Sequence, residues 1–159
     1  MASHPGGRNE YRDMVRSIVD QHGWFVQKVF AGEGSEIWPQ FAYTVGLTEM
    51  GHPEMLCHGL PLDTAHRLLN VLGEQVRAGT RFPANSAATT LTADNLLLFF
   101  IEVTNRSDLA VATMMYGEVE AVQLIWPDKQ KRFPWNEGCS IPSDQQPLRG
   151  RLPGPRVIE

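Results

Sequence analysis

The chain has 159 residues, of which 42% are hydrophobic and 20% charged, a composition typical of one globular domain and unlike that of a disordered chain. Its formal net charge of −4 argues against a general nucleic-acid binder, which usually presents a basic surface. The only cysteines, Cys57 and Cys139, are too few for a disulfide framework, so we expect a reducing, cytoplasmic compartment.

The organisation of the chain follows from its composition. The longest apolar run, residues 96–101, is far shorter than the ~20 residues of a membrane helix, so we expect no membrane partner. We predict a flexible leader over residues 1–8, which lack the apolar core of a secretory signal, and one domain over residues 9–135. Residues 136–159 contain four prolines and are predicted to be an extended or disordered tail.

The first half of the domain predicts a helix followed by three strands. Apolar residues recur at helical spacing over residues 9–22, and Gly23 follows where a helix C-cap is expected. Residues 24–30, 41–47 and 54–60 are rich in aromatic and β-branched side chains and predict strands. Strands this close in sequence usually pair, so we expect an antiparallel meander.

The middle of the chain predicts a second helix and a buried strand. Pro61 opens a helix with an apolar stripe as far as Val76. Residues 81–93 are ambiguous, with one or two short strands. The nearly unbroken apolar run over residues 96–104 predicts a strand buried on both faces.

The remaining elements are a short helix and a last strand. Ser107 and Asp108 offer a cap for a helix that ends at Tyr116, and residues 119–126 predict a strand. Helices and strands do not alternate regularly, which disfavours a doubly wound parallel sheet. The prediction is a single α+β domain: a mainly antiparallel sheet of about five to six strands, with two long helices and one short helix packed on it.

The pair His52 and Glu54 is the nearest approach to a catalytic motif. If a strand begins near His52, the two side chains share a face with Cα atoms about 6–7 Å apart. A histidine base oriented by a carboxylate, or two metal ligands, would then be possible, with Tyr43 as an acid or oxyanion donor. The structural alternative is a stiff turn whose histidine bonds to a backbone carbonyl.

The adjacent Cys57 and His58 do not extend that motif. Along an extended strand, His58 lies roughly 13 Å from Glu54, and Cys57 points to the other face. Standard zinc spacings, nucleophile elbows and phosphate-binding glycine loops are absent from the sequence. We therefore predict no metal site and a buried, inert Cys57, and the sequence identifies no cofactor.

A second candidate site is a set of aromatic and polar residues. Gln123 interrupts an apolar strand and needs either hydrogen-bond partners or an open pocket. Trp126, Asp128 and Trp135 surround a predicted turn that would fold two indoles over the sheet. The set forms either a structural aromatic cluster or one wall of a ligand pocket.

With these motifs in view, the chain resembles a bacterial family described as Domain of Unknown Function 4262. The matching segments are His22-Gly-Trp24, Phe41-Ala-Tyr-Thr-Val-Gly-Leu47, Gly51-His-Pro-Glu54, Gly59-Leu-Pro61, Gln123-Leu-Ile-Trp-Pro-Asp128 and Arg132-Phe-Pro-Trp135. The resemblance implies a small domain without an established activity, and Cys57-His58 is not part of its pattern. It nominates a set of residues as places to look: His22, Trp24, Tyr43, Thr44, His52, Glu54, Gln123, Asp128 and Trp135.

Three functions are compatible with the sequence. The favoured hypothesis is a module that binds a small molecule or a protein in an aromatic and polar pocket. The alternative is a hydrolase or lyase that uses His52 and Glu54, with or without a metal. A third is an interaction protein, for instance an inhibitor, that acts through the proline- and arginine-rich end of the chain.

Overall fold

The protein is described by a computed structural model that covers residues 5–30, 39–89 and 97–152. In chain order, its elements are α1 (Pro5–His22), β1 (Phe25–Val29), β2 (Phe41–Val45), the 3-10 turn η1 (Leu47–Met50), β3 (Glu54–His58), α2 (Leu62–Arg77), β4 (Ser86–Thr89), β5 (Leu97–Glu102), α3 (Ala110–Tyr116) and β6 (Ala121–Ile125).

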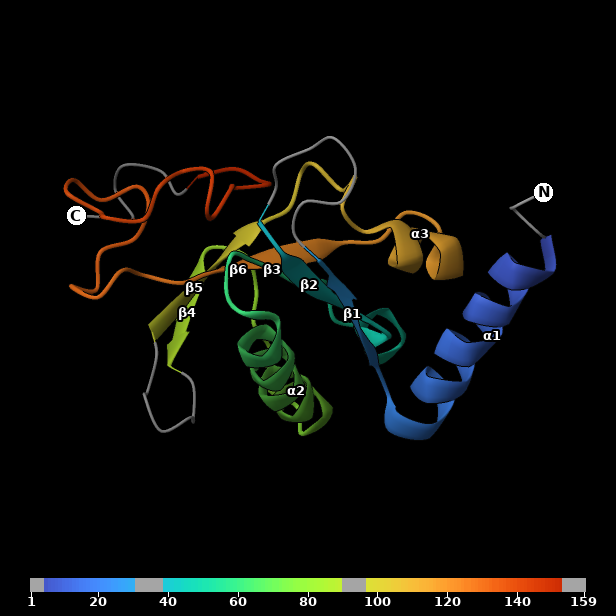
Figure 1. Cartoon of the computed structure of the whole chain (residues 1–159). Coiled ribbons are helices and arrows are strands. Elements are labelled where there is room, and N and C mark those ends of the chain that lie inside the picture. Colours follow the sequence, from blue (N-terminus) through green and yellow to red (C-terminus); the bar gives the residue numbers. More distant parts are fainter. Residues whose placement is uncertain (1–4, 31–38, 90–96, 153–159) are drawn as a thin grey trace.

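The strands form a six-stranded mixed sheet in the order β1-β2-β3-β6-β5-β4 (Figure 1). The predicted meander of the first three strands is confirmed, and every neighbouring pair is antiparallel except β3 and β6, which run parallel. With two long helices and the short α3, the predicted α+β domain is confirmed. The parallel pair places β6, the last strand in the chain, in the middle of the sheet.

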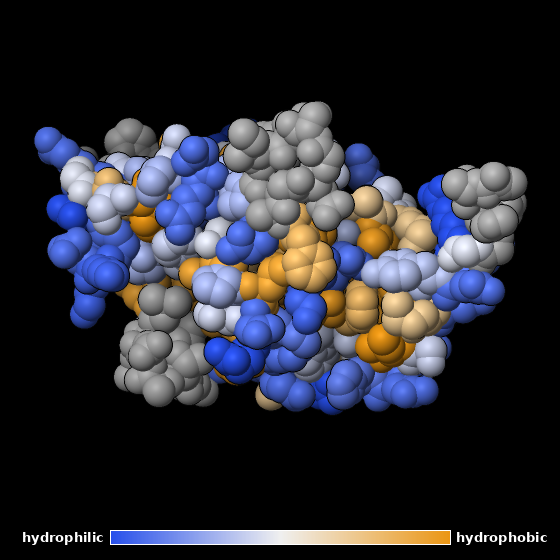
Figure 2. Space-filling model, viewed as in Figure 1, coloured by the Kyte–Doolittle hydropathy of each residue, from blue (hydrophilic) through white to orange (hydrophobic). Residues whose placement is uncertain are grey.

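Each face of the sheet is covered by different segments (Figure 1). The apolar stripe of α2 packs on one face, in a core cluster to which every strand of the sheet contributes. On the other face, α1 and α3 cover the β1–β3 end, and the segment after β6 covers β5 and β6. On the side shown in Figure 2, apolar residues gather over the middle and toward α1 and α3, whereas the end carrying the C-terminal segment is mostly hydrophilic.

The two ends of the domain differ from the prediction. The helix α1 begins at Pro5, so the predicted leader of residues 1–8 is shorter than expected. The predicted tail is part of the fold as far as Arg151, whose backbone N–H donates to the carbonyl of Glu102. Gln146 is only 1% exposed, and its amide bonds to both the N–H and the C=O of Trp126, at 2.9 and 3.0 Å. The prolines prevent regular secondary structure in this segment, but its side chains can still pack.

Gly73, in the interior of α2, packs closely against the ring of Trp24. A methyl group at this position would meet the Trp24 ring at 2.6 Å. We expect Gly73→Ala to lower the free energy of unfolding by about 1–3 kcal/mol through overpacking, in spite of alanine's better helix propensity. Urea denaturation followed by circular dichroism measures the change.

The matched control is Gly7 in α1, where a methyl group would meet no atom within 4 Å. Gly7→Ala is expected to be neutral or to stabilise the protein by up to about 1 kcal/mol. Equal effects of the two substitutions would contradict the close packing of Gly73 against Trp24.

Candidate functional site

A largely buried group of polar and charged side chains joins three distant parts of the chain. His58 is the last residue of β3 and its side chain is fully buried. Its Nε2 lies 2.8 Å from Oδ2 of Asp108, which precedes α3. Arg149, from the C-terminal segment, donates from Nε to the same oxygen at 2.8 Å. The side chains of Asp108 and Arg149 are only 13% and 15% exposed.

This group lies at an open cavity of about 250 Å³. We call this cavity the His58 site and define it by its lining residues, which are Phe41, His58, Asn105, Ser107, Asp108 and Arg149. Phe41 pairs with His58 across β2 and β3, and its ring stacks on the imidazole with centroids 4.7 Å apart. The exposed Ser107 hydroxyl donates to Oδ1 of Asn105 at 2.8 Å. The cavity therefore combines one aromatic wall with hydrogen-bonding groups and a carboxylate.

The electrostatics of the site follow from these contacts. Burial acts to raise the pKa of Asp108, but the hydrogen bonds from His58 and Arg149 outweigh it and hold that pKa below its ordinary value. Asp108 is therefore a carboxylate near neutral pH. The other ring nitrogen of His58, Nδ1, is buried and has no hydrogen-bond partner within the described segments. Because this nitrogen is closed to solvent, it is not placed to act as a base on a bound substrate.

His52 and Glu54, the pair behind the catalytic hypothesis, form hydrogen bonds that stabilise the fold. His52 is 3% exposed and lies beneath the loop that contains Phe82. Its Nδ1 lies 2.8 Å from the carbonyl of Pro53, and its Nε2 accepts the backbone N–H of Phe82 at 3.0 Å. These partners assign the proton to Nδ1 of a neutral imidazole. Burial also lowers the pKa of His52, and both ring nitrogens are engaged by the backbone.

Glu54 is fully buried and organises the turn that follows β2. Its oxygens accept three backbone N–H bonds, from Gly46, Leu47 and Thr48, at 3.0 to 3.2 Å. The hydroxyls of Thr44 and Thr48 add two shorter bonds of 2.7 and 2.6 Å. Burial raises the pKa of Glu54, against the effect of the hydrogen bonds. With these five donors, Glu54 holds the start of η1 and makes no hydrogen bond to His52.

Tyr43 and Thr44 also serve the fold. They point to opposite faces of β2, and both are buried. The Tyr43 hydroxyl accepts the backbone N–H of Val111 at 2.9 Å and so holds the first turn of α3, and burial raises its pKa. Thr44 bridges two elements, because its hydroxyl donates to Glu54 and accepts the N–H of Met55. Asp108 does not cap α3 as expected, because its carboxylate turns toward His58 instead.

His22 and Trp24 lie together at the edge of the sheet. Their rings are 6.3 Å apart, and both line a cavity of about 410 Å³ with His66, Asn70 and neighbouring residues of β1. Trp24 is 4% exposed, and its Nε1 donates to Oδ1 of Asn70 at 2.9 Å. This pair is separate from the His58 site.

Gln123 and Trp126 bond to the chain itself. Gln123 donates to the carbonyl of Pro147 at 2.8 Å and accepts the N–H of Arg149 at 2.7 Å, so its amide is satisfied by the C-terminal segment. Trp126 belongs to the core beneath α2, and its Nε1 donates to the carbonyl of His58 at 2.7 Å. The two side chains therefore support the strand and the segment that position the His58 site.

Asp128 and Trp135 stabilise the turns after β6. Asp128 accepts backbone N–H bonds from Gln130, Arg132 and Ser140 at 2.8 to 2.9 Å. Burial opposes these bonds, but the pKa of Asp128 still lies well below its ordinary value. Trp135 stacks on Phe133 and packs against Phe99, in a cluster separate from that of Trp126. The two indoles therefore do not form the wall of one pocket.

The predicted site residues do not converge in one place, and the His58 site contains none of them. Sequence reasoning missed His58, Asp108 and Arg149 because their partners lie 41 and 50 positions apart in the chain. One signal was present: a histidine at the end of an apolar strand needs a polar partner from another segment.

Two wider features bear on function. Within residues 5–30, 39–89 and 97–152, no helix is long and apolar enough to span a membrane. Over the same described ranges, no three histidine, cysteine or acidic side chains are grouped so that they could hold a metal ion.

Comparison with known proteins gives one match. The model of the family described as Domain of unknown function (DUF4262) matches residues 18–140, which is most of the chain and includes His58 and Asp108. Searches among curated proteins and among solved structures found no match.

Proposed function

The chain belongs to the DUF4262 family, and on the geometry of its His58 site we propose that it is a module that binds a small polar molecule there. The observation that carries the proposal is the largely buried His58–Asp108–Arg149 group, which lines an open cavity. Charged groups are costly to bury, and an apolar cluster of the same volume often gives a more stable fold. A shifted carboxylate in a cleft is a recognised sign of a functional site.

The size and lining of the cavity limit the ligand. About 250 Å³ is below the usual range for drug-sized ligands, so the occupant is comparable to a single amino acid or one heterocyclic ring. Phe41 provides a flat apolar wall on which such a molecule can stack. Asn105, Ser107 and Asp108 provide polar groups at the cavity surface that would orient it.

Binding is better supported than catalysis. The free nitrogen of His58 is closed to solvent, and the Ser107 hydroxyl donates to Asn105 rather than to a histidine. His52 and Glu54, the pair behind the hydrolase or lyase alternative, are both satisfied by other partners. A small-molecule partner also agrees with the acidic net charge, which gives nucleic acid no general attraction.

The test is a titration of the isotope-labelled protein with single amino acids and nucleobases, followed by the backbone amide signals in NMR. We expect at least one compound to shift the signals of Asn105, Ser107 and Asp108 in a saturable way. Phe41→Ala removes the stacking wall and should weaken that binding about tenfold, since an aromatic contact and its buried area contribute roughly 1.5 kcal/mol. The matched control is Phe30→Ala, because Phe30 is 66% exposed and lines a different cavity.

A second variant guards against misfolding. Asn105 is exposed, so Asn105→Ala should leave the thermal midpoint nearly unchanged while it weakens binding. The proposal is wrong if no compound gives saturable shifts at these residues, or if binding survives both Phe41→Ala and Asn105→Ala. The His58 site would then serve only to join β3 to the C-terminal segment.

A further inference from the structure

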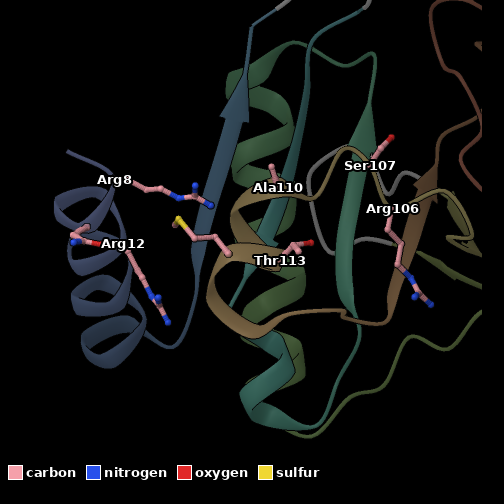
Figure 3. Close-up of a pocket in the computed structure, with 8 residues that line it drawn as sticks. Arg8, Arg12, Arg106, Ser107, Ala110 and Thr113 are labelled. Carbon is pink, nitrogen blue, oxygen red and sulfur yellow. The ribbon is translucent and has the colours of Figure 1, made fainter. Parts of the chain in front are cut away.

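Another cavity, of about 720 Å³, lies between α1 and the start of α3 with the segment before it, and three of its lining residues are arginines. We call it the arginine groove; Arg8, Asn9, Arg12, Arg106, Ser107 and Thr113 are among its lining residues. Figure 3 shows Arg8 and Arg12 leaving α1 on the side that faces α3, with Arg106 and Ser107 on the segment before α3. The residues that line it include no carboxylate.

The two arginines of α1 are placed unfavourably for the helix alone. Arg8 and Arg12 are four residues apart, so they lie on one helix face, where like charges destabilise a helix. Within the described part of the chain, neither forms an ion pair. Arg16, one turn further on, pairs with both Asp20 and Glu49 at 2.8 and 2.7 Å. The helix therefore neutralises the third arginine of this series and leaves the first two facing the groove.

Arg106 brings a third positive charge from a different segment. Its Nε is buried and has no hydrogen-bond partner among the described residues. Its acidic neighbour is Glu118, at 3.6 Å, but the Glu118 side chain is 86% exposed and such a pair is weak in water. The groove is therefore positively charged, although the net charge of the whole chain is −4.

We propose that the arginine groove binds the phosphate groups of a polyphosphorylated compound. Guanidinium groups bind phosphate oxygens in pairs of hydrogen bonds, and the Ser107 and Thr113 hydroxyls and the Asn9 amide add further hydrogen-bonding groups. In Figure 3, the Arg106 side chain points away from Arg8, so the three guanidinium groups do not converge on one point. The arrangement fits a chain of phosphates better than a single one.

This proposal does not depend on the function proposed for the His58 site. The two cavities share only Ser107, and neither uses the other's charged residues. The same chemistry is offered by a free polyphosphate compound and by the head groups of anionic phospholipids, so the experiment includes both.

The primary measurement is calorimetric titration of the full chain with inorganic tripolyphosphate at low ionic strength. We expect saturable binding that weakens as salt is added. Arg12→Ala and Arg106→Ala should each weaken it about tenfold, since a hydrogen bond to a charged group is worth about 1.5 kcal/mol or more. Orthophosphate should bind more weakly than tripolyphosphate by a similar factor.

The matched control is Arg67→Ala. Arg67 is an exposed arginine of α2, which packs on the opposite face of the sheet, so its loss should leave tripolyphosphate binding unchanged. A His58→Ala variant that keeps tripolyphosphate affinity would show that the groove acts independently of the His58 site.

Sedimentation with phosphatidylglycerol vesicles distinguishes the two sources of phosphate. Vesicle binding that Arg12→Ala and Arg106→Ala abolish would support phosphate recognition with a lipid as the natural source. The proposal is overturned if neither tripolyphosphate nor vesicles bind, or if Arg67→Ala reduces binding as much as the groove variants do.

Discussion

A chain that ends at Asn136 is expected to lose its cooperative unfolding transition. The segment removed supplies four hydrogen bonds to the central strand and its end, two to the Gln123 amide and two to the backbone of Trp126. It also covers the apolar cluster of Phe99, Ile101 and Ile125 with Leu148. Whole domains are stable by only about 5–15 kcal/mol. The loss of these four hydrogen bonds, at about 1 kcal/mol each, together with the apolar contacts of Leu148, removes most of that free energy.

Circular dichroism and urea denaturation of the truncated chain measure this effect. A matched pair of point variants isolates the hydrogen-bond contribution. Gln146→Ala leaves the N–H and C=O of Trp126 without partners and should cost about 2 kcal/mol, whereas the exposed neighbour Gln145 should tolerate the same change within about 0.5 kcal/mol. A truncated chain with wild-type stability would contradict the packing of the C-terminal segment.

The same expectation changes how a partner-binding experiment on this segment is read. If deletion of residues 137–159 abolishes binding to a partner, the loss of the folded sheet explains it without any interface on the tail. Point variants at exposed positions such as Arg151 separate the two explanations, because this side chain faces solvent.

Glu54→Gln is expected to lower the free energy of unfolding by about 3 kcal/mol. One carboxylate oxygen of Glu54 accepts two hydrogen bonds and the other accepts three. Whichever oxygen the NH₂ group of glutamine replaces, at least two donors then face another donor in a fully buried site. Each unsatisfied buried group costs about 1–3 kcal/mol.

Glu120→Gln provides the control for this substitution. Glu120 lies just before β6 and is exposed, so the same change in chemistry should alter stability by less than about 0.5 kcal/mol. Urea denaturation of both variants, with the unfolding slope compared to that of the wild type, gives the difference. Similar stabilities for the two variants would show that Glu54 does not organise the η1 turn.

Most of the fold could be predicted from the sequence, because its elements are encoded locally. The apolar stripe of α2 and the aromatic and β-branched residues of β1 can each be recognised within a short stretch of sequence. The parallel pairing of β3 with β6 could not be predicted, because no local sequence pattern indicates which distant strand pairs with the free edge of β3. The packing of the C-terminal segment was missed for the same reason, because its prolines indicate only the absence of regular structure.

The candidate site was less predictable than the fold. His52 and Glu54 stand out because they are close in sequence, yet the folded chain gives each of them backbone partners. Strand geometry correctly separates His58 from Glu54, but it does not indicate the contact between His58 and Asp108. Local spacing finds sites built from one segment, and here the group of His58, Asp108 and Arg149 is assembled from three segments.

The central position of β6 has a consequence for synthesis on the ribosome. The strands β3 and β5 both emerge before β6, and each must wait for it with one backbone edge unpaired. Exposed strand edges of this kind invite pairing with other chains. The nascent protein therefore passes through an aggregation-prone interval that closes only when residues 121–125 and the segment beyond them have left the exit tunnel, and chaperone dependence of its yield would reveal that interval.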